Sequence, residues 1–304
     1  MTGAPTSRIF TDAVTLTPVA PEHFDTAFTA VTQPVPWPKA YGGDLVAQAV
    51  VAAMRTVGDG KSLNSAHSYF MRPADIGAEV RYEVEHLRDG RGFSTRQVRA
   101  FQNGKAIYTC LASFAAGEPG QDHQAVFPAD VPEPETLPSS AEYLAGRTGG
   151  TMTEASRAYW SHGRSFDMRH VPGPVYLTVE GAGLAHQAVW VRPFDRLRPV
   201  AGLNPAQRDL AALAYVCDYT ILESVLRVCG LSWATEGLVT ASLDHAMWFH
   251  RPAPVDGWLL YAQEVVSAAA GRGAALGRFF TPDGSHLATV VQEGLIRTLP
   301  GARS

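Results

Sequence analysis

The sequence predicts an α+β protein in which two copies of one unit follow each other, each a long antiparallel sheet wrapped around a central helix. The first observation behind this prediction is a repeated phrase, because HSYFMRP at 67–73 returns as HAMWFHRP at 245–252. The second is that the sequences after both phrases keep a common register. The third is that each phrase follows an apolar, helix-forming segment and precedes several strand-like segments.

Three landmarks keep the register between the two halves. The Arg-Pro pairs that begin at Arg72 and Arg251 lie 179 residues apart, and the two Gly-Arg-Gly triplets lie 181 apart. The turn sequences that begin at Asn103 and Asp283 lie 180 apart. An offset that varies by only two residues indicates an internal duplication, with two unrelated α+β domains as the alternative.

The first unit begins with a segment that is predicted to be a buried helix. Gly42-Gly43 is followed by DLVAQAVVAAM, which is rich in good helix formers and apolar on almost every side. A helix that is apolar all round must be buried all round. We expect Gly58-Asp59-Gly60 to end it.

The rest of the first unit is predicted to be strand. Apolar and charged residues alternate over 79–87, which places Tyr82 on the core face and Glu83 on the opposite face. Asn103-Gly104 between two apolar segments is a strong hairpin signal, because both residues tolerate positive φ. Since no helix separates these strands, they should pair in antiparallel fashion.

The second unit repeats this plan. DLAALAYVCDYTILESVLRVCG is its central helix and should end at Gly230. Its strands are expected at Val239–His250, Gly257–Ser267, Ala274–Thr281 and His286–Arg297. One buried helix wrapped by one long, curved antiparallel sheet is the hotdog fold, so the chain is predicted to be a double hotdog. The two sheets should join edge to edge, which would hide two exposed edge strands.

The domain organisation follows from this repeat. We expect an N-terminal hotdog over 1–117, a Pro-rich linker over 118–163 and a C-terminal hotdog over 164–304. The linker contains FPADVPEPETLPSS, which is polar, rich in proline and unsuited to regular structure. SSAEYLAGRTG within it predicts one short helix, and we assign no chemistry to this segment.

The composition limits the classes of function. Hydrophobic residues make up 46% and charged residues 18%, as in soluble globular proteins. A net charge of −4 argues against a nucleic-acid partner, and no apolar window approaches the length of a membrane span. Neither the start MTGAPTSRIFTDAV nor the end GARS resembles a targeting signal. Three scattered cysteines predict no disulfide framework and no zinc site. We therefore expect a cytoplasmic protein without a metal or cofactor.

Common catalytic motifs do not occur in the sequence. G-x-S-x-G, the P-loop and H-E-x-x-H are absent. GRGAALG has the wrong spacing for a dinucleotide loop and lies between two predicted strands. His67, His245 and His250 fall on predicted strands, where a histidine is usually a sheet residue rather than a ligand. Cys217 falls on an apolar helix and is expected in the core.

Several long strings carry a resemblance to a known family. They are AYGGDLVAQAV, HSYFMRPAD, LRDGRGFSTRQVRAFQNG, DYTIL, SLDHAMWFHRP, WLLY, GRG and VQEGLIR. The chain resembles the acyl-CoA thioesterase II family, the double-hotdog thioesterases of bacteria and peroxisomes. The resemblance covers Phe24 to Arg297 apart from the linker. It implies hydrolysis of fatty acyl-CoA to free fatty acid and CoA, and self-association as a homo-dimer or homo-tetramer.

The same resemblance implies a three-residue site. Its members would be Asp218 in DYTIL, Ser242 in SLDHAMWFH and Gln292 in VQEGL, with Ser242 where many members have threonine. The chemistry agrees, because a thioester is already activated and needs only a positioned water and a base. Asp218 would accept the proton of a water that Ser242 and Gln292 hold. A purely local structural role for Asp218 is the alternative.

Substrate-binding residues are predicted at two further places. Backbone N–H groups at a helix N-terminus stabilise a developing oxyanion, so we expect Gly42 and Gly43 to face Asp218 across the junction of the two hotdogs. The CoA phosphates favour arginine or lysine. Arg91 and Arg272 are our candidates, with Arg88 and Arg96 as further ones.

The repeat predicts one working site in each chain. By register the counterpart of Gln292 is Ala112 and that of Ser242 is Leu63, and neither can hold a water. The mirrored site should be inactive unless Asp44 and its neighbours rebuild it. Two other functions stay open: a non-catalytic acyl-CoA binding module, and a hotdog enoyl-CoA hydratase, which would need an Asp–His pair.

Overall fold

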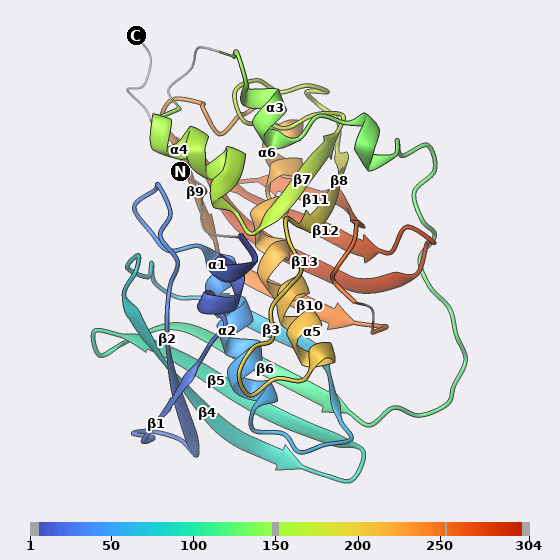
Figure 1. Cartoon of the computed structure of the whole chain (residues 1–304). Helices are drawn as coiled ribbons and strands as arrows, with labels where there is room; N and C mark the ends of the chain where they lie inside the picture. Colours follow the sequence, from blue (N-terminus) through green and yellow to red (C-terminus); the bar gives the residue numbers. More distant parts are fainter. Residues whose placement is uncertain (1–5, 148–151, 253, 300–304) are drawn as a thin grey trace.

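A single antiparallel sheet forms the framework of the molecule. The computed structural model describes residues 6–147, 152–252 and 254–299, so part of the N-terminal string and all of the C-terminal GARS lie outside it. Within these ranges, thirteen strands join in the order β1-β2-β4-β5-β6-β3-β10-β13-β12-β11-β8-β7, and β9 also pairs with β13 (Figure 1). The strands are β1 (Thr17–Val19), β2 (Thr26–Val31), β3 (Ser62–Phe70), β4 (Glu79–Asp89), β5 (Phe93–Gln102), β6 (Lys105–Ala115), β7 (Phe166–Val171), β8 (His186–Pro193), β9 (Leu238–Ser242), β10 (Asp244–Phe249), β11 (Leu259–Ala269), β12 (Arg272–Phe280) and β13 (His286–Thr298).

The helices are short in comparison. They are α1 (Thr6–Ala13), α2 (Gly42–Met54), α3 (Ser140–Leu144), α4 (Glu154–Ala158), α5 (Pro205–Val216) and α6 (Glu223–Val228), with 3-10 turns η1 (Pro134–Thr136) and η3 (Cys217–Tyr219) and a π-helical turn η2 (Tyr159–Gly163). In Figure 1, α2 and α5 lie side by side against the sheet, and the two pack on each other. No helix in the described ranges is long and apolar enough to cross a membrane.

The two repeated phrases meet in the middle of the sheet. The first phrase, HSYFMRP, contains the last four residues of β3, and the second, HAMWFHRP, contains most of β10. These two strands pair with each other. Tyr69 lies opposite Asp244, and Ser65 lies opposite Trp248. The predicted edge-to-edge joining of the two halves is therefore confirmed, and the duplicated strands themselves form the seam. The seam carries Asp244 only two residues from Ser242.

The first central helix is buried as predicted but ends earlier than predicted. Every residue of α2 after Gly42 is buried. The helix ends at Met54 rather than at Gly58-Asp59-Gly60. The backbone N–H of Thr56 donates to the Ala53 carbonyl at 3.1 Å, three residues back rather than four, and the Thr56 hydroxyl donates to the same carbonyl at 2.8 Å.

The second central helix is broken, which corrects the prediction of one continuous helix to Gly230. α5 ends at Val216, η3 follows, and α6 begins at Glu223. Thr220 lies in the break with φ −132° and ψ −5°. Two buried amides hold it there, because Gln263 donates to the Thr220 hydroxyl at 2.6 Å and Gln187 to its carbonyl at 3.4 Å. Asp218 consequently lies in a tight 3-10 turn rather than in a regular helix.

The strands predicted after each central helix are present, with two corrections, whereas β1, β2, β7 and β8, which precede the central helices, were not predicted. The segment expected as one strand over Val239–His250 is interrupted at Leu243, whose N–H donates to the Glu293 carbonyl at 2.9 Å. Tyr82 is buried on the core face as predicted, but Glu83 is buried as well. The backbone N–H groups of residues 22–24 fold over Glu83 and donate to its carboxylate, which local alternation does not reveal.

The hairpin predicted at Asn103-Gly104 is confirmed. Both residues have positive φ, 51° and 70°, between β5 and β6. This mirror-type turn matches the twist of the paired strands.

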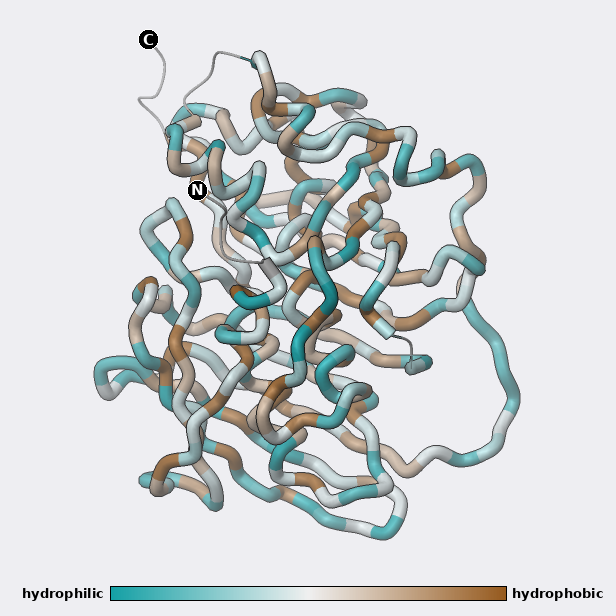
Figure 2. Tube along the Cα trace, in the orientation of Figure 1, coloured by the Kyte–Doolittle hydropathy of each residue, from teal (hydrophilic) through white to brown (hydrophobic). Residues whose placement is uncertain are grey.

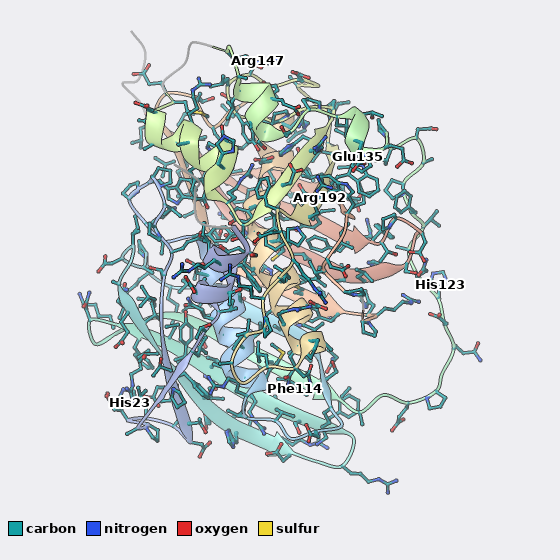
Figure 3. The ribbon with its side chains drawn as sticks, in the orientation of Figure 1. His23, Phe114, His123, Glu135, Arg147 and Arg192 are labelled. Carbon is teal, nitrogen blue, oxygen red and sulfur yellow. The ribbon has the colours of Figure 1, made fainter. Side chains whose placement is uncertain are left out.

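The linker lies against the second half. The predicted short helix is α3, which a capping box at Ser139 begins, whereas α4 and η2 were not predicted. The stretch before α3 has no regular structure apart from η1 and forms the loop on the right of Figure 1, in mostly hydrophilic to neutral colours in Figure 2. Figure 3 shows Glu135 next to Arg192 of β8, and these two residues form an ion pair of 3.7 Å. Gln124 also donates to the Gly284 carbonyl at 2.8 Å.

Candidate active site

Asp218, Ser242 and Gln292 meet at one point in the second half. The Ser242 hydroxyl donates to Oδ1 of Asp218 at 3.1 Å, and Nε2 of Gln292 donates to the same oxygen at 2.7 Å. The same Nε2 lies 3.0 Å from the Ser242 hydroxyl. The three side chains that the sequence singled out therefore form one hydrogen-bonded triangle.

The sheet register explains why Ser242 and Gln292 point at the same carboxylate. Ser242 lies opposite Gly294 in the pairing of β9 with β13. Gln292 lies two residues before Gly294, so both side chains emerge on the core face. Gln292 is fully buried, and its Oε1 has no hydrogen-bond partner in the described part of the chain. A buried amide oxygen without a partner is a place where a water would be held.

The N-terminus of α2 approaches Asp218 from the first half. A Cβ atom placed on Gly42 would lie 2.6 Å from Oδ2 of Asp218, so only glycine leaves room for the carboxylate. A Cβ on Gly43 would overlap the Tyr215 carbonyl oxygen. The backbone N–H of Gly43 hydrogen-bonds Asp218. The predicted approach of this glycine pair to Asp218 is thus present in the structure.

The charge state of Asp218 reflects opposing influences. Burial raises the pKa of its carboxyl above the usual value. Hydrogen bonds from Gln292, Ser242 and Gly43 and the charge of Lys39 work in the opposite direction. Asp218 is therefore a stronger base than an exposed aspartate, while its partners still stabilise the charged form.

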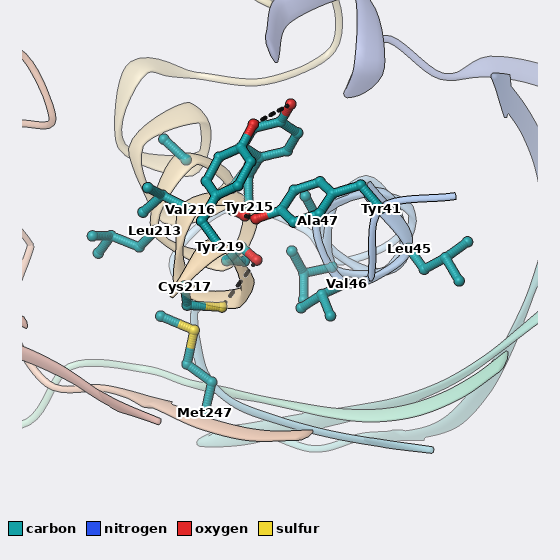
Figure 4. Close-up of a cluster of buried hydrophobic side chains, with 14 of the residues drawn as sticks. Tyr41, Leu45, Val46, Ala47, Leu213, Tyr215, Val216, Cys217, Tyr219 and Met247 are labelled. Carbon is teal, nitrogen blue, oxygen red and sulfur yellow. Dashed lines mark hydrogen bonds between the residues drawn. The ribbon is translucent and has the colours of Figure 1, made fainter. Parts of the chain in front are cut away.

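Two neighbours of the site were missed from sequence. Lys39 donates through Nζ to the carbonyl of Thr240 on β9. Tyr41 donates to the Tyr215 carbonyl at 2.6 Å, and its ring stacks on that of Tyr219 with centroids 4.3 Å apart (Figure 4). No spacing or periodicity marks either residue, because both act across the junction between the two halves.

The first half lacks the partners of an equivalent site. Leu63 lies opposite Phe114 just as Ser242 lies opposite Gly294, and Ala112 stands two residues before Phe114. An apolar side chain and a methyl group therefore replace the hydroxyl and the amide.

Asp44 is a buried carboxylate in the first turn of α2. Gln33 holds the Asp44 carboxylate instead, with its backbone N–H at 2.8 Å and its side-chain amide at 3.1 Å. Burial raises the pKa of Asp44 to about 7.

The two arginines predicted to bind CoA lie at opposite ends of the sheet. Arg272 lies opposite Leu295, next to the position that faces Ser242, and its Nε is 3.1 Å from Glu293. Arg91 lies in the turn after β4, at the end where β3 begins. Tyr69 lies seven positions after Ser62 on β3. Its partner on β10 is Asp244, which follows Ser242 by two residues.

About nine residues of strand, roughly 30 Å, therefore separate Arg91 from the triangle. Arg91 therefore does not lie beside Asp218, and its proposed contact with the CoA phosphates stays a prediction. Arg88 is exposed on the same hairpin as Arg91. Arg96 is 2% exposed and donates to Asp89, Thr56 and backbone carbonyls, so it has a structural role.

The histidines and Cys217 do not join the triangle. His67 packs edge-on against Trp248, and His250 contacts Thr289. His245 is buried with Nε2 3.2 Å from the sulfur of Cys217. Among the described residues, no histidine hydrogen-bonds Asp218, which leaves the hydratase interpretation without its Asp–His pair.

Comparisons with known proteins agree with this architecture. The family model for the acyl-CoA thioesterase N-terminal domain matches residues 33–115, and that for the C-terminal domain matches residues 128–296. Acyl-CoA thioesterase 2 of Haemophilus influenzae is 33% identical over 278 residues, which cover 90% of this chain and 93% of that protein.

Two solved structures cover nearly the whole chain. An acyl-CoA thioesterase II from Mycobacterium marinum is 32% identical with a TM-score of 0.72, covering 96% of this chain and 99% of that one. A hot dog protein of unknown function from Alicyclobacillus acidocaldarius has a TM-score of 0.73 at 19% identity, covering 95% of this chain and 98% of that one, and shows the fold alone. The family models, the full-length relative and the double hotdog together show that the chain belongs to the acyl-CoA thioesterase II family.

Proposed function

We propose that this protein hydrolyses fatty acyl-CoA thioesters to free fatty acid and CoA, using a water that Asp218 activates and that Ser242 and Gln292 hold. The observation that carries the proposal is the convergence of both side chains on one oxygen of Asp218. Its other oxygen faces Gly42 at the start of α2. A base, a water-holding pair and backbone donors thus stand around one point.

The reaction needs nothing beyond these groups and the substrate. The water oxygen attacks the thioester carbonyl carbon while Asp218 accepts one water proton. The negative charge that develops on the carbonyl oxygen is stabilised by the positive end of α2, which begins at Gly42. The intermediate then collapses, the carbon–sulfur bond breaks, and the proton on Asp218 passes to the CoA sulfur. No cofactor or metal takes part in this scheme.

The relatives support the same chemistry. The Haemophilus influenzae and Mycobacterium marinum proteins are both named acyl-CoA thioesterases. Serine at position 242 fits the proposal, because its hydroxyl is the only part that the water needs. We further propose that Arg272, at the same end of the sheet as Ser242, contacts the CoA phosphates. We expect the protein to act in the cytoplasm as a homo-dimer or homo-tetramer.

Release of free CoA thiol from saturated acyl-CoAs of increasing chain length tests the proposal. The wild type should turn over at least part of this series, and Asp218→Asn should lose nearly all activity. Asp209→Asn is a matched control, because Asp209 lies on α5 and pairs with Arg208 instead. A wild type that binds acyl-CoA without releasing thiol would favour the non-catalytic binding module.

A further inference from the structure

Lys39 reaches from the first half to the strand that carries Ser242. It lies in the loop of residues 32–41 that connects β2 to α2, three residues before Gly42. Its Nζ donates to the Thr240 carbonyl, two residues before Ser242. The N–H of Ala40 donates to the Ala74 carbonyl at 2.9 Å, which anchors the loop beside Lys39. The ammonium is therefore held half-buried against β9, two residues from Ser242.

Among the described residues, the other groups whose pKa responds to the charge of Asp218 are not cations. Asp44 faces it from α2, Tyr41 from the turn before α2 and Tyr261 from β11, and Cys217 is its neighbour in η3. Each of these groups is neutral or negative. Lys39 contributes the opposite charge, which lowers the pKa of Asp218.

We propose that Lys39 is a positioning residue of this site, whose ammonium keeps Asp218 ionised and stays close while negative charge moves from Asp218 to the thioester oxygen. The inference rests on the proposed role of Asp218 as the base. Burial alone would favour a protonated Asp218, and a protonated carboxyl cannot accept a proton from water. A fixed cation also needs no rearrangement when the charge moves, which is how preorganised sites lower a barrier.

The two groups depend on each other. Burial lowers the pKa of Lys39, and the negative charge of Asp218 raises it again. Removing the cation should therefore raise the pKa of Asp218 and move the acidic limb of the activity profile to higher pH. A purely structural tether to Thr240 would not have this effect.

Three variants separate charge from tethering. Lys39→Met removes both the charge and the donor, Lys39→Gln keeps a donor without charge, and Lys39→Arg keeps both. We expect Met and Gln to lower kcat about tenfold or more at neutral pH and to shift the acidic limb upward, whereas Arg restores most of both. Lys105→Met is the matched control, since Lys105 is exposed at the start of β6 and its loss should change neither quantity.

The experiment distinguishes this proposal from the function on which it rests. Thiol release by the wild type that Asp218→Asn abolishes supports the proposed function, whatever Lys39 does. An unchanged acidic limb in Lys39→Met and Lys39→Gln, with effects only on KM or on the unfolding temperature, would refute the role of Lys39 alone. A wild type without turnover would remove both proposals.

Discussion

Gln292 donates a hydrogen bond of 2.7 Å to Asp218, which lies 74 residues earlier in the chain. The same amide nitrogen lies 3.0 Å from the Ser242 hydroxyl, so one nitrogen orients both the carboxylate and the hydroxyl. The amide oxygen of Gln292 is buried without a partner in the described ranges. This single side chain thus donates to Asp218 and keeps one buried acceptor, which our proposal assigns to the attacking water.

Gln292→Ala should therefore reduce turnover strongly while the protein stays folded. We expect kcat to fall about 10- to 100-fold, because Asp218 loses its shortest hydrogen bond and the water loses an acceptor. The measurement is release of CoA thiol at saturating acyl-CoA. Gln97→Ala on the outer face of β5 is the control, and thiol release within about twofold of wild type for Gln292→Ala would contradict the assignment.

Gly42→Ala should disturb the site by steric overlap alone. The added Cβ would lie 2.6 Å from Oδ2 of Asp218, so the carboxylate or the start of α2 must shift. We expect kcat to fall about tenfold or more, because small displacements of catalytic groups are costly. Gly58→Ala is the matched control, since nothing lies within 4 Å of a Cβ there. Equal activities of the two variants would argue against a close approach of α2.

Ser242→Thr and Ser242→Ala should differ. Threonine keeps the hydroxyl that donates to Asp218 at 3.1 Å, so we expect turnover near that of the wild type. Alanine removes the hydroxyl, and we expect a loss of about tenfold or more. The ratio of kcat values for the two variants, measured on one acyl-CoA, is the test. Equally impaired variants would mean that the space around position 242 matters more than its hydroxyl.

Asp44→Asn should change how stability depends on pH. The pKa of Asp44 is raised from 3.8 to about 7 in the folded protein. Between these values the folded state binds a proton that the unfolded state has released, so this group's contribution to stability falls as pH rises. The variant should gain about 1–4 kcal/mol relative to wild type across this window.

Urea unfolding at several pH values measures this difference, with Asp59→Asn, an exposed residue after α2, as the control. A pH-independent difference would mean that Asp44 is ionised throughout. Because Leu63 and Ala112 leave Asp44 without a hydroxyl or an amide of the Ser242 and Gln292 kind, the variant should also retain thiol release.

Much of the fold could be predicted because its signals are local. The apolar segment after Gly43 is buried on all sides, and Asn103-Gly104 turns the chain with positive φ. The break at Thr220 could not be predicted, since it depends on amides of Gln187 and Gln263 on other strands. The burial of Glu83 could not be predicted for the same reason, because the loop of residues 22–24, distant in sequence, supplies its hydrogen bonds.

The candidate site divides in a similar way. Resemblance selected Asp218, Ser242 and Gln292, and the register of β9 with β13 explains how the last two come to share a face. Lys39 was missed because a lone lysine in a proline-rich loop carries no pattern. Arg91 was selected because CoA phosphates favour arginine, and it lies between β4 and β5 of the first half, where its role stays a prediction.

The sequence by itself determined the duplication, the alternation of the strands and the buried character of the central helices. Periodicity and turn preferences act between neighbours in the chain, so they can be recognised without the fold. Only the tertiary structure decided that β3 pairs with β10, and that pairing sets which groups of one half face the other. Gly42 therefore approaches Asp218 and Lys39 bonds the strand of Ser242, because contacts between the halves depend on the sheet seam and not on local sequence.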